Sequence, residues 1–221
     1  MVTRIAIAVG ILNLLVPIGI FVYADVADKD YRYLFWDADT TANWFSSIQL
    51  TLIAIAAYIN FEMAGLIKKL DESRSRRPWI WLVIAFGFIF LACDEQFELH
   101  DLLSEDVLEP SRLFSWVPYI QDGDVVLYFY MATGLVFAFY LLDELRRVRP
   151  SLLYFSLAVV LAMATIIVDS LGWPVVKNWP LQGFWTSAFE EIGELWAQYL
   201  FLLSFLIMLK KRLGLLADMR V

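Results

Sequence analysis

The sequence has very few of the side chains that most metal and redox enzymes use. Its 221 residues include one cysteine, Cys93, and one histidine, His100. A single cysteine excludes an internal disulfide, and a single histidine excludes a zinc site built from several imidazoles. A glycine-rich phosphate loop, a Cys-x-x-Cys pair and a His-Glu-x-x-His motif are also absent. The common nucleotide-binding, thiol-redox and zinc-protease motifs are therefore missing.

Positive charge is also scarce, with 17 Lys and Arg residues against 24 Asp and Glu residues and a net charge of −7. Binding of nucleic acid requires a basic surface, so we expect no nucleic-acid partner. Hydrophobic residues make up 61% of the chain, and the mean hydropathy is +0.65. Because soluble domains are about 45–50% apolar, the composition predicts an integral membrane protein whose main partners are membrane lipids.

Six apolar stretches are long enough to cross a bilayer, which takes about 20 residues of helix. They cover residues 5–24, 44–67, 79–100, 124–142, 151–173 and 185–209. The first resembles a signal peptide, but its apolar core is as long as a full span and residues 22–25 form a poor cleavage site. The sequence therefore predicts an all-α, multi-pass membrane protein, a single bundle of six transmembrane helices over residues 1–221.

The Lys and Arg residues are concentrated on one side of this bundle, and such a bias sets the orientation of multi-pass proteins. Arg4, the segments 68–77 and 146–149 and the tail after residue 209, including Arg212, fall on that side. The opposite side holds only Lys29, Arg32, Arg112 and Lys177. We therefore expect both termini to be cytoplasmic, and we call the basic end of the bundle the inner end and the opposite end the outer end.

A run of ionisable residues follows the uncharged stretch 79–91 near the outer end of the third span. It contains Asp94, Glu95, Glu98, His100 and Asp101. Ionisable residues inside a membrane segment are costly and usually functional. On a continuous helix with 100° per residue, the four carboxylates occupy an arc of about 120° and the histidine lies well off it. The spacing predicts one acidic face and a histidine directed elsewhere.

A second acidic run lies at a matching depth near the start of the last span. Glu190, Glu191 and Glu194 form it, and Asp169 on the fifth span has a similar depth. Exposure of carboxylates to lipid costs free energy, so we expect the two runs to face each other. We expect no Lys or Arg residue inside the membrane beside them. Like charges at this spacing cannot all be ionised, so the cluster either shares protons or binds a cation.

Carboxylate oxygens favour hard divalent ions such as Ca²⁺, Mg²⁺ and Mn²⁺, and an added histidine would extend the choice to Fe²⁺ or Zn²⁺. The Glu-x-x-His pattern of di-iron bundles is absent. The candidate metal ligands are Asp94, Glu95, Glu98, His100, Asp101, Asp169, Glu190, Glu191 and Glu194. Within this set, Asp101 and His100 are expected to control access from the outer side.

The two runs resemble a pair of motifs in uncharacterised bacterial multi-pass inner-membrane proteins. The first motif, Asp-Glu-x4-His-Glu, resembles Asp94-Glu95-x4-His100-Asp101, in which Asp101 replaces the glutamate. The second, Glu-Glu-x-x-Glu at the start of the final helix, resembles Glu190-Glu191-x-x-Glu194. The resemblance implies a shared site and the bacterial inner membrane as location. It implies no particular chemistry.

These observations favour a buried cation site, for protons or a divalent metal, that serves ion transport or sensing. One alternative is a non-catalytic accessory subunit of a larger membrane complex, in which the polar cluster stabilises helix packing. Another is an intramembrane metal-dependent hydrolase acting on lipid, in which the metal activates water and a glutamate acts as general base. The uncharged stretch 79–91 counts against an open channel.

Overall fold

A computed structural model of the chain describes residues 2–29, 34–35, 40–70, 77–111, 124–176 and 189–218. Across these ranges the secondary structure is helical, with no strand. Three short helical segments, α5 (Leu99–Leu103), η1 (Ser104–Leu108) and α6 (Glu109–Ser111), follow one another. The long helices are α1 (Val2–Val26), α3 (Thr41–Leu70), α4 (Trp79–Phe97), α7 (Asp124–Leu145), α8 (Arg149–Val176) and α9 (Phe189–Asp218).

All six long helices are long and apolar enough to cross a membrane. This confirms the predicted all-α bundle of six spans. Most of the helices extend a few residues beyond the predicted spans, since polar flanking residues continue a helix outside an apolar run. The third span is shorter than predicted, because α4 ends at Phe97 rather than residue 100. The predicted start of the last span, at residue 185, lies outside the described residues.

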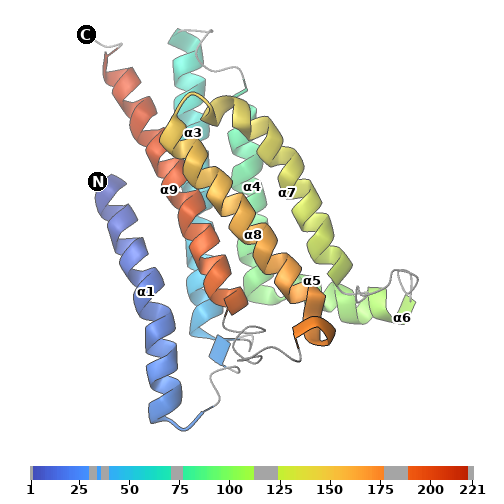
Figure 1. Ribbon diagram of the computed structural model, residues 1–221. Helices are drawn as coiled ribbons and strands as arrows, with labels where there is room; N and C mark the ends of the chain where they lie inside the picture. The colour runs from blue at the N-terminus through green and yellow to red at the C-terminus, as the bar shows by residue number, and fades with distance from the viewer. Residues whose placement is uncertain are drawn as a thin grey trace.

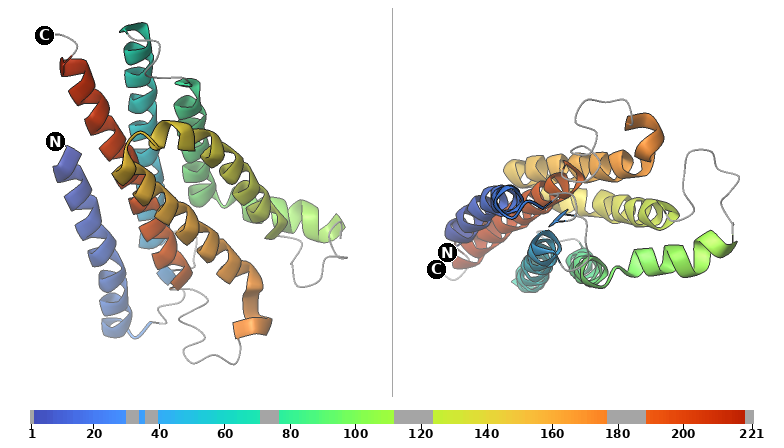
Figure 2. Two further views of the ribbon diagram at one scale, coloured as in Figure 1. Left: turned by 45° about the horizontal axis from the view of Figure 1, so that its top comes forward. Right: turned by 90° about the horizontal axis from the view of Figure 1, so that it is seen from below.

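The most extensive helix contacts join α8 with α9, α3 with α4, and α3 with α9 (Figure 1). Helix α1 packs on α9 and α3, while α7 packs on α8 and α4 (Figure 2). Because α9 contacts α1, α3 and α8, side chains on several of its faces are enclosed by protein. The acidic run near the start of α9 is therefore directed partly into the bundle.

The core holds stacked and edge-on aromatic rings. The ring centroids of Trp81 and Phe205 are 5.1 Å apart, and those of Phe88 and Phe201 are 5.5 Å apart. Offset and edge-to-face pairs of this kind add about 0.5–1.5 kcal/mol beyond the area that they bury. Outside this core, large apolar side chains such as Phe129 and Phe139 are each 68% exposed. This outer surface suits contact with lipid.

Two glycines allow helices to approach closely. A Cβ atom built on Gly193 would lie 2.5 Å from Cγ2 of Thr165, and one built on Gly10 would lie 2.6 Å from the hydroxyl oxygen of Tyr199. Small residues at such points let transmembrane helix backbones come together. Gly193 thus brings α8 against α9 within the second acidic run, although the sequence contains no GxxxG pattern there.

The described basic residues are concentrated toward one end of the bundle. The chain ends and the turn between α7 and α8 lie toward this end (Figure 1). The residues involved are Lys68, Lys69, Arg77, Arg146, Arg147, Arg149, Lys210 and Lys211. This arrangement agrees with the inner end predicted from the sequence.

Candidate metal centre

Three carboxylates from two helices meet near the outer end of the bundle. Each of Glu95 on α4 and Glu191 and Glu194 on α9 offers an oxygen, and these oxygens all lie within 4.8 Å of one another. The three-residue spacing of Glu191 and Glu194 places both on one face of α9. All three side chains are partly buried. Oxygens bound to one Ca²⁺ at about 2.3–2.6 Å are at most about 5 Å apart, so the spacing fits a shared cation.

Helix α3 adds a polar connection to this group. The Glu95 carboxylate is hydrogen-bonded to the Ser46 side chain, and Ser46 accepts a hydrogen bond of 2.7 Å from Nε2 of Gln198. Ser46 and Gln198 are both buried. Oε1 of Gln198 is also buried and has no hydrogen-bond partner among the described residues. Gln198 lies one turn beyond Glu194 on α9, so its side chain continues the polar connection from Glu95 through Ser46 to α9.

Asp94 belongs to a different arrangement from its neighbour Glu95. Its carboxylate accepts a hydrogen bond from the main-chain N–H of His100 at 2.9 Å, and Nδ1 of the same residue lies 2.8 Å from Oδ2. The hydroxyl of Tyr130 on α7 donates to Oδ1 at 3.3 Å. Asp94 is only 5% exposed. The carboxylate thus connects the end of α4 to α5 and α7.

The predicted orientation of His100 is wrong for a specific reason. Helix α4 ends at Phe97, and Glu98 adopts a left-handed conformation with φ 47° and ψ 44°. The chain then turns sideways from the axis of α4 (Figure 1), so His100 contacts Asp94 instead of continuing around one helix. The 100° increments of a continuous helix do not apply beyond residue 97.

The acidic face predicted for the third span does not form one group, because Asp94 and Glu95 have different partners. Adjacent helical residues point about 100° apart, and here Asp94 contacts His100 and Tyr130 while Glu95 joins the acids of α9. The two groups are nevertheless close, because Asp94 and Glu95 are consecutive residues of α4.

The remaining candidate ligands are not part of the three-carboxylate group among the described residues. Glu98 is partly buried in the turn after α4, and Glu190 is partly buried in the first turn of α9. The backbones of Asp101 and Asp169 lie in α5 and α8, but the placement of their side chains lies outside the described part of the structure. The sequence did not identify Ser46, Gln198 or Tyr130 as parts of the site, since isolated polar residues in spans usually serve packing.

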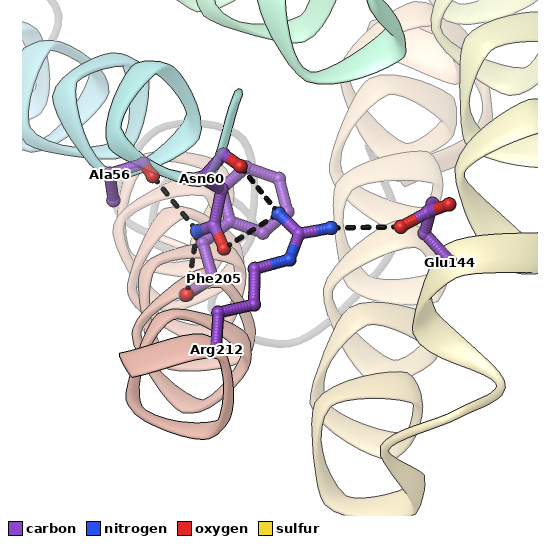
Figure 3. Close-up of polar contacts among 5 residues, drawn as sticks. All are labelled: Ala56, Asn60, Glu144, Phe205 and Arg212. Carbon is purple, nitrogen blue, oxygen red and sulfur yellow. Dashed lines mark hydrogen bonds and ion pairs between the residues drawn. The ribbon is translucent and has the colours of Figure 1, made fainter. Parts of the chain in front are cut away.

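A second polar cluster lies toward the inner end of the bundle, away from the carboxylates of α4 and α9. The sequence placed Arg212 in a cytoplasmic tail. In the structure, α9 continues to Asp218, so Arg212 is a residue of this helix, and its side chain is buried. Its Nη2 lies 2.8 Å from Oε2 of Glu144 on α7. Its Nη1 donates to the main-chain and side-chain oxygens of Asn60 on α3, at 2.6 and 3.1 Å (Figure 3). The guanidinium also lies 4.7 Å from the ring centroid of Trp81 on α4.

Comparison with known proteins assigns the chain to a family but gives no biochemical activity. The model of a family described as a domain of unknown function (DUF8692) matches residues 2–209. This match includes the acidic residues of both α4 and α9. No curated protein and no solved structure matches the chain.

Proposed function

The chain belongs to the DUF8692 family, and we propose that it is an integral membrane protein that binds a cation between α4 and α9 for ion transport or sensing. This proposal rests on one observation: carboxylate oxygens of Glu95, Glu191 and Glu194 lie within 4.8 Å of one another. Crowded carboxylates in a partly buried site are stabilised either by shared protons or by a bound cation.

The set of donors favours a hard divalent ion. The three carboxylates supply oxygen ligands, and Gln198, one turn beyond Glu194, has a buried amide oxygen without a hydrogen-bond partner among the described residues. Ca²⁺, Mg²⁺ and Mn²⁺ accept carboxylate and amide oxygens together with water. The only imidazole, that of His100, is not part of the three-residue group and is bonded to Asp94. A softer ion such as Zn²⁺ therefore has less support.

The position of the cluster favours access from the outer side. The stretch 79–91 of α4, toward the inner end, contains no charged residue. Farther inward, the buried pair of Arg212 and Glu144 connects α9 with α7. These features support a site that exchanges its ion with the outer side. Transport across the membrane would require this inner contact to open.

Metal binding by the purified protein tests the proposal. Isothermal titration calorimetry with Ca²⁺, Mg²⁺ and Mn²⁺ should detect binding of a divalent ion to the wild-type protein. Elemental analysis should detect a divalent ion that copurifies with it. Glu95→Gln, Glu191→Gln and Glu194→Gln should each weaken binding about tenfold or more, because each removes a charged ligand. Glu62→Gln is the matched control, since Glu62 is exposed on α3. Absence of binding in the wild type, or wild-type affinity in the Glu194→Gln protein, would overturn the proposal.

Transport and sensing differ in whether the ion crosses the membrane. The protein can be reconstituted into liposomes that enclose a dye sensitive to the ion that binds. Influx that is lost in Glu194→Gln but kept in Glu62→Gln would indicate transport. Binding without influx would indicate sensing.

A further inference from the structure

The chain leaves the bundle after α4. Residues 99–111, in α5, η1 and α6, extend sideways from the end of α4 (Figure 1), and the view from below shows the same direction (Figure 2). The change of direction occurs at Glu98, which has a positive φ of 47°. We call residues 99–111 the lateral helix. Because the six long helices cross the membrane, a helix that runs across their axes lies roughly parallel to the membrane plane.

The lateral helix exposes several large apolar side chains. Leu99 is 38% exposed, Leu102 54%, Leu103 44% and Val107 51%. Their spacing of three and four residues is that of neighbours on one side of a helix, and the exposed Asp106 falls at the same spacing from Leu103 and Leu102. Ser104, in contrast, is only 8% exposed. The segment thus exposes four large apolar side chains while Ser104 is buried, and the exposed Asp106 lies among them.

The first turn of the lateral helix is held firmly to the bundle. Both the main-chain N–H and the ring of His100 contact Asp94, at 2.9 and 2.8 Å. The lateral helix also contacts α7 through α5. Its direction is therefore fixed at the end of α4.

We propose that the lateral helix lies in the outer membrane interface, with Leu102, Leu103 and Val107 in contact with the acyl chains of the outer leaflet. These side chains continue the lipid-facing surface of the adjoining spans, on which Phe97 is 64% exposed and Phe129 68% exposed. Amphipathic helices that lie in the interface plane bury their apolar face about 5–10 Å deep at the boundary of headgroups and acyl chains. The proposal is independent of cation binding at Glu95, Glu191 and Glu194.

Site-directed spin labelling tests this position. Cys93→Ser removes the only cysteine, and a nitroxide is then attached to Leu102→Cys or Val107→Cys in lipid nanodiscs. Collision with O₂, which concentrates in lipid, is compared with collision with a water-soluble nickel chelate. Phe129→Cys gives the lipid reference, and Asp218→Cys, at the exposed inner end of α9, gives the water reference. We expect both labels to match the lipid reference.

Two results would overturn the proposal. Labels that collide with the nickel chelate as readily as the Asp218→Cys label would place the face in water. If neither O₂ nor the nickel chelate reaches the labels, and the spectra show dipolar broadening between nitroxides on two chains, a second copy of the protein covers this face. Leu103→Cys provides another exposed position if a label at Leu102 disturbs folding.

Discussion

Nη2 of Arg212 lies 2.8 Å from Oε2 of Glu144, and each side chain is only 3% exposed. The same guanidinium donates to both oxygens of Asn60 and lies over the ring of Trp81. One side chain of α9 therefore binds groups on α3, α4 and α7. A buried ion pair of this kind is weak evidence of net stabilisation, but loss of one partner leaves an uncompensated charge in a low-dielectric region.

Removal of the charge of Glu144 is therefore expected to be costly. Glu144→Gln leaves Arg212 buried without its counter-ion and should lower the free energy of unfolding by about 3–5 kcal/mol. Thermal or denaturant unfolding in detergent micelles measures the change. Asp143→Asn is the neighbouring control, because Asp143 forms an exposed pair with Arg146 at 3.6 Å. Such exposed pairs contribute at most about 1 kcal/mol.

The double replacement Arg212→Met with Glu144→Met separates charge from packing. Apolar replacement of both partners removes the uncompensated charge and should recover part of the stability lost in Glu144→Gln. If Glu144→Gln destabilises no more than Asp143→Asn, the pair is not buried as described.

Gly193 permits the close contact between α8 and α9. Gly193→Ala would place a Cβ atom 2.5 Å from Cγ2 of Thr165, and overpacking of this kind typically costs about 1–3 kcal/mol. The additional change Thr165→Ser removes the methyl group in conflict, so the double variant should regain most of the lost stability. Unfolding of both variants under the same detergent conditions gives the comparison.

Gly134→Ala is the matched control for this prediction. No atom lies within 4 Å of a Cβ built on Gly134, and alanine has the better helix propensity by about 1 kcal/mol. This variant should be neutral or slightly more stable. Equal losses in Gly134→Ala and Gly193→Ala would show that backbone effects, and not the contact with Thr165, cause the change.

His100 holds the turn between α4 and α5. His100→Ala removes the ring contact with Asp94 but keeps the main-chain hydrogen bond. Hydrogen bonds to charged groups contribute about 1.5–3 kcal/mol, so amide hydrogens of residues 98–103 should exchange faster in the variant. Tyr130→Phe removes a longer contact of 3.3 Å and should have a smaller effect. Unchanged exchange in His100→Ala would contradict a role for the ring in this turn.

The sequence alone was sufficient to predict the six spans and the identity of one half of the site. Long apolar runs specify membrane helices directly, and the spacing of Glu191 and Glu194 defines a shared face on any helix. The meeting of these residues with Glu95 followed from depth and from the cost of exposing carboxylates to lipid. These inferences depend on local composition and helix geometry.

Other features depend on tertiary contacts that the sequence does not display. Glu98 is neither glycine nor asparagine, the residues that usually adopt left-handed helix ends, so nothing in the pattern indicated that α4 stops at Phe97. The contact between Asp94 and His100 accompanies this turn and separates Asp94 from Glu95. Arg212 lies beyond the apolar run of the last span, and only its partners on other helices explain its burial.

A reciprocal amide pair connects α1 to α3. Nδ2 of Asn13 donates to Oε1 of Gln49 at 3.0 Å, and Nε2 of Gln49 donates to Oδ1 of Asn13 at 3.3 Å. The two side chains are at most 1% exposed. Either Asn13→Leu or Gln49→Leu leaves one buried amide without this partner and should cost about 1–3 kcal/mol.

Replacement of both amides by leucine should cost less than the sum of the two single changes, because no buried amide is then left unpaired. A double-mutant cycle measured by unfolding in detergent gives this coupling energy directly. Leu14→Ala is the control on the same helix, since Leu14 is 54% exposed on the lipid-facing side. Additive losses in the cycle would mean that Asn13 and Gln49 act independently, and the attachment of α1 would then depend mainly on its packing against α9.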